Sequence, residues 1–470
     1  MRADHEKRAR RVSLGTHIGY GVAGIGENTA YNIYYLYFIF FLTTVSGINP
    51  AVAGTIAFIA VLWDAFTDPA VGYISDHLRS KHGRRRPFMV VFIIPFGIVI
   101  GLLFTNATFL AGWAKIAYYL VINILFWVFF TSVDIPYVSL GAEITTDFAE
   151  RSKLRTIANI FMNIGSLLAF ATTMIVVEFF TNLWGSKDAG WSSMAVIFAL
   201  ITVITYLLSW KFTKGKEAPV DTRAARQPFN LIKLLKEYVD VIKNRPVVYI
   251  VAFTLLICGG TSGMAASSLA FYGAYNLGLD EMGISKIFLC YSVGVLVLSI
   301  MVGFVGTKFS STLGKGKTLG CATLIAGVGL IFTYFLDTSL AIGYAVSLLH
   351  ALGQAGYWVF NYAMAYDCAV ADEHKYGKKR EGTVVAVISF FYKLATAVGM
   401  WLTGIILQYA GFNAEAVVQT PNALHGIQMS AIFLPGIAIF LCSLLAFKYP
   451  LTQAKFDELQ KAIAQRKAGA

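Results

Sequence analysis

Apolar residues in this chain are grouped into blocks of roughly 20 or more, the length that crosses the hydrocarbon core of a bilayer. A backbone in lipid must satisfy its hydrogen bonds internally, and no alternating pattern of a membrane β-barrel is present, so the blocks are predicted to be helices. Only 14% of the residues are Asp, Glu, Lys or Arg, against about 25% in soluble proteins. An ordinary cytosolic protein is therefore excluded, and the sequence predicts an all-α membrane protein.

The blocks predict twelve transmembrane helices in two six-helix bundles. The spans of the first bundle lie near 17–45, 50–75, 87–106, 112–140, 155–180 and 190–211. Those of the second bundle lie near 247–276, 283–307, 317–337, 340–368, 383–410 and 425–448. The predicted organisation is a basic N-terminus at 1–16, bundles at 17–212 and 246–448, a linker with an amphipathic helix at 213–245, and a tail at 449–470.

Basic residues predict the orientation of the chain. Nearly all of the 38 Lys and Arg residues fall at the termini and in alternate loops, whereas the opposite loops hold only Lys115, Lys187 and Lys286. This bias places both termini in the cytoplasm. The net charge of +12 is accounted for by topology, so no nucleic-acid partner is expected. No removable signal peptide is evident, and we expect a multi-pass monomer in a bacterial plasma membrane.

A weak internal repeat relates the two halves. VGYISDHLRSKHGRRRP follows the second span and VGFVGTKFSSTLGKGK follows the eighth. Two bundles related by such a repeat, with a site at their interface, are typical of the major facilitator arrangement. The first copy also resembles the major facilitator signature GxxxD…GR(K/R). We expect a cytoplasmic gate formed by Asp76, Arg79, Arg84, Arg85, Glu373 and Arg380.

Ionisable residues within the spans are candidate functional residues, because each costs on the order of 3 kcal/mol at bilayer depth. Asp64 and Asp68 are spaced i, i+4 in LWDAFTDPAVG and project from one helix face. Thr67 adds a hydroxyl, and Pro69 frees the carbonyl of Ala65. Such oxygens suit Na⁺, or H⁺ if one carboxyl stays neutral. The alternative is that one aspartate caps a helix or pairs with a lysine.

Residues of three other spans are candidates for binding a substrate. Asp134 in FFTSVDIPYVSL can accept hydrogen bonds from a polyhydroxylated ligand, and Thr131 can complete the cation shell. Lys393 is the only basic residue predicted to be buried away from the ends of the spans, and it is either a ligand contact or a charge-balancing partner. Trp358 is a candidate platform for a sugar ring. Most of the remaining aromatics, including the tyrosines of the first span, are expected to pack between helices or at the membrane interface.

These motifs together resemble the glycoside, pentoside and hexuronide to cation symporter family, whose best-known member is melibiose permease. The resemblance rests on WDAFTDPAVGYISDHLRSKHGRRRP, DIPYVSL and YDCAVADEHKYGKKREG. It covers about 19–155 and 357–407.

The resemblance implies which residues bind the two ligands. The cation site maps onto Asp64, Asp68 and Thr131, with Thr67 in place of an asparagine, and implies Na⁺ held at the two aspartates, or H⁺ or Li⁺. Among the sugar contacts, Asp134, Trp358 and Lys393 are matched, whereas Asn28, Val138 and Asn159 replace an aspartate, a tryptophan and an arginine. Galactoside specificity is therefore not transferred. The amides at Asn28 and Asn159 still donate and accept hydrogen bonds, which suits a neutral polyol.

The leading hypothesis is symport of a sugar or glycoside with Na⁺ or H⁺, with no cofactor other than the coupling ion. A close alternative keeps the fold and carries a lysolipid, as distant relatives of the family do. A third alternative is an intramembrane prenyltransferase that uses the DxxxD pair at Asp64 and Asp68. The only later acidic pair, Asp372 and Glu373, lies in a basic loop, so an enzyme is not expected.

Overall fold

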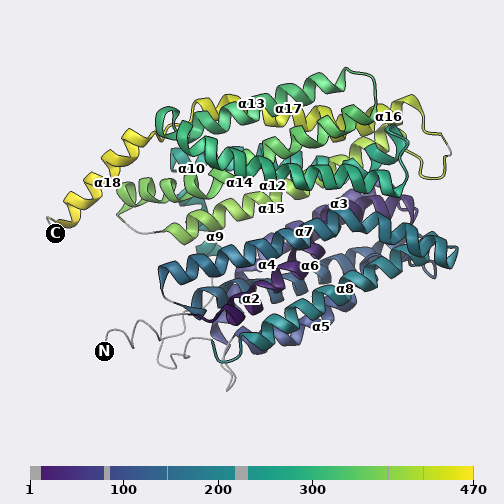
Figure 1. The fold of residues 1–470 in the computed structure, drawn as a ribbon, viewed down its shortest axis with the longest axis horizontal. Coiled ribbons are helices and arrows are strands. Elements are labelled where there is room, and N and C mark those ends of the chain that lie inside the picture. The colour runs from purple at the N-terminus through teal and green to yellow at the C-terminus, as the bar shows by residue number, and fades with distance from the viewer. Residues whose placement is uncertain are drawn as a thin grey trace. The chain divides into compact units, whose positions relative to one another are not determined.

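The computed structural model describes residues 12–78, 85–145, 147–216, 231–377, 380–416 and 418–468, and every regular element within them is a helix (Figure 1). The first half contains α2 (Leu14–Gly21), α3 (Ala23–Thr44), α4 (Pro50–His77), α5 (Arg85–Leu103), α6 (Gly112–Ile144), α7 (Phe148–Trp184) and α8 (Lys187–Phe212). The second half contains α9 (Leu231–Ile242), α10 (Arg245–Cys258), η1 (Gly259–Ala265), α11 (Ala266–Phe271), η2 (Tyr272–Asn276), α12 (Glu281–Leu313), α13 (Lys315–Tyr334), α14 (Leu340–Tyr376), α15 (Glu381–Tyr409), α16 (Pro421–Gln428), η3 (Met429–Phe433), α17 (Leu434–Phe447) and α18 (Gln453–Ala468).

Ten helices or continuous helical runs of the described residues are long and apolar enough to cross a membrane. Among the predicted spans, those at 17–45 and 340–368 are not in this set. The corresponding helices, α3 and α14, carry polar residues along their length, including Asn28 and Asn32 in α3 and Gln354 in α14. These polar residues lower the mean hydropathy of the two helices.

The chain divides into two compact units. Unit 1 contains Met1–Phe41 and Ile59–Phe229, and unit 2 contains Leu42–Phe58 and Asn230–Ala470. The division after Phe229 lies within the predicted linker. The grouping of Leu42–Phe58 with unit 2 was not predicted, because the sequence pattern assigns this segment to the first bundle.

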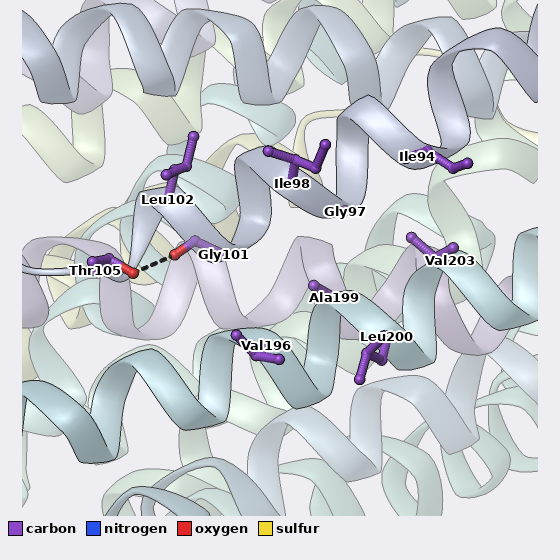
Figure 2. A pocket seen from close by; sticks show the side chains of 10 residues that line it. All are labelled: Ile94, Gly97, Ile98, Gly101, Leu102, Thr105, Val196, Ala199, Leu200 and Val203. Carbon is purple, nitrogen blue, oxygen red and sulfur yellow. Dashed lines mark hydrogen bonds between the residues drawn. The ribbon is translucent and has the colours of Figure 1, made fainter.

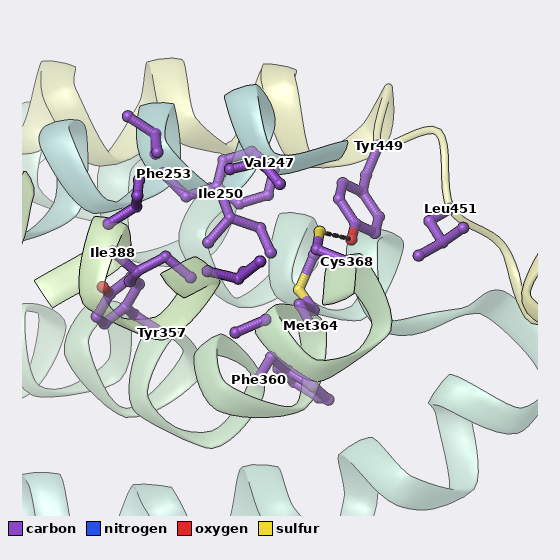
Figure 3. Packing of buried hydrophobic residues seen from close by; sticks show 14 of the residues in the cluster. Val247, Ile250, Phe253, Tyr357, Phe360, Met364, Cys368, Ile388, Tyr449 and Leu451 are labelled. Carbon is purple, nitrogen blue, oxygen red and sulfur yellow. Dashed lines mark hydrogen bonds between the residues drawn. The ribbon is translucent and has the colours of Figure 1, made fainter. Parts of the chain in front are cut away.

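The core of unit 2 is built from residues far apart in the sequence (Figure 3). Val247, Ile250 and Phe253 of α10 lie beside Tyr357 and Cys368 of α14. The thiol of Cys368 and the Tyr449 hydroxyl are 3.4 Å apart, so this core pairs its buried polar groups. The packing holds α14 against α10 and fixes the helix that carries Trp358.

The core of unit 1 is rich in aromatic rings. Tyr34 is fully buried, with its ring centroid 5.0 Å from that of Trp127 and 5.2 Å from that of Phe126. Tyr35 and Tyr37 are also buried. The tyrosines of the first span therefore pack between helices, as expected from the sequence.

Three segments of unit 2 are π-helical, namely η1, η2 and η3. In η1, a Cβ atom added to Gly263 would lie 2.6 Å from the carbonyl oxygen of Thr396 and 2.9 Å from Cα of Gly399. Thr403 donates its hydroxyl proton toward the Met264 carbonyl at 3.3 Å. Two glycines thus let α15 approach η1 closely, and a threonine of α15 bonds to its backbone. Such π segments occur frequently at functional sites.

Candidate functional site

Two aspartates of α4 converge on one threonine of α6 within unit 1. The Thr131 hydroxyl oxygen lies 2.5 Å from Oδ1 of Asp64 and 3.1 Å from Oδ1 of Asp68. Asp64 and Thr131 are buried, whereas Asp68 is partly exposed. The i, i+4 spacing in α4 places both carboxylates on the face that meets α6. The three oxygens predicted for the cation site therefore lie together.

Two further features of α4 lie at the same level. The Thr67 hydroxyl donates to the Asp64 carbonyl at 3.2 Å, so it bonds to the helix backbone in this structure. Pro69 lies inside α4 and has no N–H, which leaves the carbonyl of Ala65 without its helical donor. The predicted Thr67 contribution would require its side chain to rotate away from the Asp64 carbonyl.

The charge of this cluster defines its chemistry. Two carboxylates next to each other repel when both are ionised, and Thr131 has a single proton that it can donate. A bound proton or a hard cation relieves the repulsion, and carboxylate and hydroxyl oxygens are the ligands that such cations prefer. The described residues contain no group of three or more His, Cys, Asp or Glu side chains suited to a metal ion. The site is thus one of two carboxylates supplemented by a hydroxyl.

A second polar network of unit 1 joins α3 to α7. Ser166 donates its hydroxyl proton to Oδ1 of Asn28 at 3.1 Å. Nδ2 of Asn32 donates to the Asn28 carbonyl at 2.7 Å and to the Ser166 hydroxyl at 3.1 Å. Asn28 was predicted as a substrate contact, whereas Asn32 and Ser166 were not. The i, i+4 spacing of the two asparagines is the signal that could have identified Asn32.

Charged residues of unit 1 gather around Asp134. Glu27 interacts electrostatically with Asp134 and with Arg155. Arg155 precedes the predicted contact Asn159 by one helical turn of α7, and both side chains are exposed. Arg155 therefore supplies a guanidinium one turn from the position where the family has an arginine. Arg155 was not predicted, because the family arginine aligns with Asn159, one turn further along α7.

The predicted substrate residues of unit 2 lie on α14 and α15. The Trp358 ring centroid is 5.6 Å from that of Tyr392, and Lys393 follows Tyr392 on α15. Both Trp358 and Lys393 are partly exposed. Asn361, one turn beyond Trp358, is 6% exposed, and its Oδ1 has no hydrogen-bond partner among the described residues. An aromatic face and amide groups thus occur together on α14.

The predicted gate residues are only partly covered by the structure. Arg79 and Arg84 lie outside the described residues, and Asp76 is described only by its place in α4. Nε of Arg85 lies 2.7 Å from Oε1 of Glu143, with both side chains at most 10% exposed. The Glu373 carbonyl accepts the Gly377 N–H at the end of α14. Arg85 is thus tied to α6.

Arg380 forms a bidentate ion pair with a carboxylate that the prediction did not include. Its Nε and one terminal nitrogen each lie 2.8 Å from Asp372, which is fully buried. The hydrogen bond to Asp372 raises the pKa of Arg380 above its already high ordinary value. Lys315 likewise pairs with Asp367 at 2.6 Å. These pairs were not predicted because their partners lie 8 and 52 residues apart without a regular spacing.

An apolar groove of about 460 Å³ lies between α5 and α8 (Figure 2). It is lined by Ile94, Gly97, Ile98, Gly101, Leu102, Thr105, Val196, Ala199, Leu200 and Val203. Its only side-chain hydroxyl, on Thr105, donates to the Gly101 carbonyl at 2.8 Å. A groove without a charged or amide side chain does not suit a polyol.

Comparison with known proteins assigns a family to this arrangement. Residues 19–453 match the model of the family described as MFS/sugar transport protein. The chain is 25% identical to the isoprimeverose transporter of Lactiplantibacillus pentosus over 97% of its own length and 93% of that protein's. It is 26% identical to the glucuronide carrier protein homolog of Escherichia coli (strain K12), over 97% of each chain.

Solved structures support the same fold. A bacterial homolog of the human lysosomal transporter Spinster, in an inward-facing and occupied conformation, superposes with a TM-score of 0.66 at 13% identity. The superposition covers 94% of this chain and 97% of that one. At this identity the likeness concerns the fold alone.

Proposed function

Because the chain belongs to the MFS/sugar transport protein family, we propose that it is a secondary active symporter that takes up a sugar or glycoside with a coupling cation by alternating access. The observation that carries the cation part of the proposal is the Thr131 hydroxyl shared by Asp64 and Asp68. A buried acid with a second acid beside it in a membrane helix is unfavourable unless an ion or proton accompanies the pair. A bound cation would offset their repulsion and hold α4 against α6.

The proposal includes twelve membrane-spanning helices with both termini in the cytoplasm. Ten apolar helices make the chain a multi-pass membrane protein, and we assign the two further spans to α3 and α14. Both carry proposed substrate residues, and polar groups are expected where a helix lines a transport pathway. The Lys and Arg bias between loops supports the cytoplasmic placement of the termini. We place the protein, as a monomer, in the bacterial inner membrane.

The proposed substrate is a hydroxylated sugar. Asn28, Ser166 and Asn32 in unit 1 offer amide and hydroxyl groups, and Trp358 in unit 2 offers an aromatic face. Two relatives are named for isoprimeverose and for glucuronides. Such polar groups suit a sugar better than the acyl chain of a lysolipid. Family membership likewise favours a transporter over a prenyltransferase.

The coupling ion is Na⁺ or H⁺, with Li⁺ as a further candidate, and no other cofactor is proposed. Binding of the ion raises the affinity for sugar, and by linkage the sugar raises the affinity for the ion by the same factor. Transport of the two ligands is then coupled, because the form of the protein that binds both is favoured over the forms that bind one.

The test is uptake of isoprimeverose and of methyl β-D-glucuronide into proteoliposomes with an inward Na⁺ gradient, an inward H⁺ gradient or no gradient. We expect one gradient to drive accumulation of at least one sugar, and Asp68→Asn to abolish the accumulation. Asp240→Asn on α9 is the matched control, because its carboxylate pairs with Lys243 at an exposed position. Equal sugar levels under all three conditions, or gradient-driven accumulation by Asp68→Asn, would contradict the proposal.

A further inference from the structure

A polar cluster of unit 2 plays no part in the function as proposed so far. Tyr291 of α12 donates its hydroxyl proton to Oε1 of Gln354 on α14. Nε2 of Gln354 donates to the Ser262 hydroxyl of η1 at 3.4 Å. Residues of two other elements therefore hold both ends of the Gln354 carboxamide, which fixes the direction in which the amide group points.

Gln354 lies on the same face of α14 as the predicted sugar platform. It precedes Trp358 by four residues and Asn361 by seven, a spacing that places all three on one side of a helix. The Gln354 side chain is partly exposed, whereas its neighbours Gly353 and Ala355 are buried. A row of amide, indole and amide groups thus runs along α14.

One hydrogen-bond donor of this cluster has no partner within the described ranges of the chain. A carboxamide has two N–H protons, and Ser262 accepts one from Nε2 of Gln354. No described residue accepts the second. Because the Gln354 side chain is partly exposed, its second proton is available to a ligand that accepts a hydrogen bond.

The backbone of η1 supports the same interpretation. Its π-helical turns include Ser262, and the close approach of Gly263 to Gly399 holds them against α15. Ser262 is 9% exposed, so its hydroxyl is available to few groups other than Gln354. A local change of helix type thus places the hydroxyl that orients the amide.

We propose that Gln354, oriented by Tyr291 and Ser262, donates a hydrogen bond from Nε2 to a hydroxyl oxygen of a sugar whose ring stacks on Trp358. Gln354 is then a specificity-determining residue, and Tyr291 and Ser262 are positioning residues. This inference rests on the proposed sugar symport and extends it by assigning a hydroxyl-recognition subsite to unit 2. A sugar that lacks the contacted hydroxyl should bind about tenfold more weakly, as expected when a site built to hydrogen-bond a group is left unpaired.

The test measures the Kd of the purified full-length protein for isoprimeverose and for its monodeoxy analogues. Gln354→Glu keeps the size and the acceptor for Tyr291 but removes the amide donor. We expect Gln354→Glu to bind isoprimeverose about tenfold more weakly than wild type and to bind one monodeoxy analogue as wild type does. Tyr291→Phe should weaken isoprimeverose binding by a smaller factor, with the same analogue unaffected.

The matched control is Gln428→Leu, compared with Gln354→Leu. Gln428 donates from Nε2 to the Thr338 hydroxyl at 2.8 Å at an exposed position, so its replacement should leave the Kd unchanged. Elution as a single symmetrical peak in detergent identifies the variants that fold. If Gln354→Leu does not fold, the isosteric Gln354→Glu is compared with wild type instead. Binding of isoprimeverose by Gln354→Glu at the wild-type Kd would overturn this inference alone. Absence of sugar binding by wild type in every salt would overturn the symport proposal, and this inference with it.

Discussion

Two helices related by the internal repeat, α4 and α12, differ in what they bury. When Val71 is aligned with Val302, the positions of Asp64 and Asp68 in α4 correspond to Val295 and Ser299 in α12. In the apolar stretch of α4, half of the residues are buried and the mean hydropathy is 1.6. In that of α12, 17% of the residues are buried and the mean hydropathy is 2.4. A helix that carries two acids must direct them toward other helices, because charged side chains are unfavourable in lipid. A helix without acids can face lipid. The two acids proposed to bind the cation therefore occur in one copy of the repeat.

The largest expected effect is that of Asp64→Asn, compared with Ser299→Asn in α12 at the position that corresponds to Asp68. Asp64 is fully buried and accepts the short hydrogen bond from Thr131. We expect Asp64→Asn to lower cation-driven uptake by about 100-fold or more, because loss of a buried ligand charge removes several kcal/mol of ion binding. Ser299→Asn should keep uptake within about twofold of wild type, as expected for a surface change. Equal losses in the two variants would contradict the asymmetry.

The second prediction compares the buried ion pairs of the two units. Arg380→Gln leaves the fully buried Asp372 unpaired and should lower the free energy of unfolding by about 3–5 kcal/mol. Arg85→Gln should cost less, because the Glu143 side chain is 8% exposed whereas that of Asp372 is fully buried. Lys455→Gln, which breaks an exposed pair with Glu458, should cost under about 1 kcal/mol. Thermal midpoints in detergent test the order, and a larger effect at Lys455 would refute it.

The third prediction concerns the hydroxyl shared by the two aspartates. Thr131→Val keeps the shape and removes one oxygen, so the affinity for the coupling cation should fall about tenfold or more, within the range of lost partners at metal sites. Thr172→Val is the control, because the Thr172 hydroxyl bonds only to the Leu168 carbonyl of its own helix. Cation-dependent thermal shifts report the affinity, and a wild-type titration curve for Thr131→Val would remove Thr131 from the site.

The smallest effect is expected at the network between α3 and α7. Ser166→Ala removes a donor to Asn28 and an acceptor for Asn32, and should weaken sugar binding by about threefold to tenfold. The affinity for the cation alone should not change, because the hydrogen bonds of this network join α3 to α7, whereas Asp64, Asp68 and Thr131 lie on α4 and α6. A change in cation affinity equal to the change in sugar affinity would show that the two sites are not separate.

The sequence predicted that the acids of the proposed cation site lie together, because their positions follow a regular local spacing. Asp64 and Asp68 share a helix face by their i, i+4 positions, and both the residues of the fourth span and the family motif predicted Thr131. Spacing could not predict that Gln354 meets Tyr291 and Ser262, since these residues lie 63 and 92 positions away on other helices.

The π-helical turns of η1 were beyond local reasoning as well. Their geometry depends on the approach of Gly399, which is distant in the chain. Lys315 and Asp367 likewise pair across 52 positions, so that Asp367, a charged residue of a predicted span, is satisfied by a partner that no periodicity identifies. Local sequence patterns thus identified the acidic residues within the spans, whereas their ion-pair and hydrogen-bond partners depend on tertiary packing.

The most direct test of the central claim is the thermal stability of wild type and Asp68→Asn with isoprimeverose, in sodium chloride and in choline chloride, at pH 5.5 and pH 7.5. A ligand of the native state stabilises by RT ln(1 + [L]/Kd). We expect sugar to stabilise wild type only when sodium or acid pH supplies the coupling ion, and Asp68→Asn to lose this dependence. Sugar stabilisation of Asp68→Asn that still required sodium or acid would contradict it.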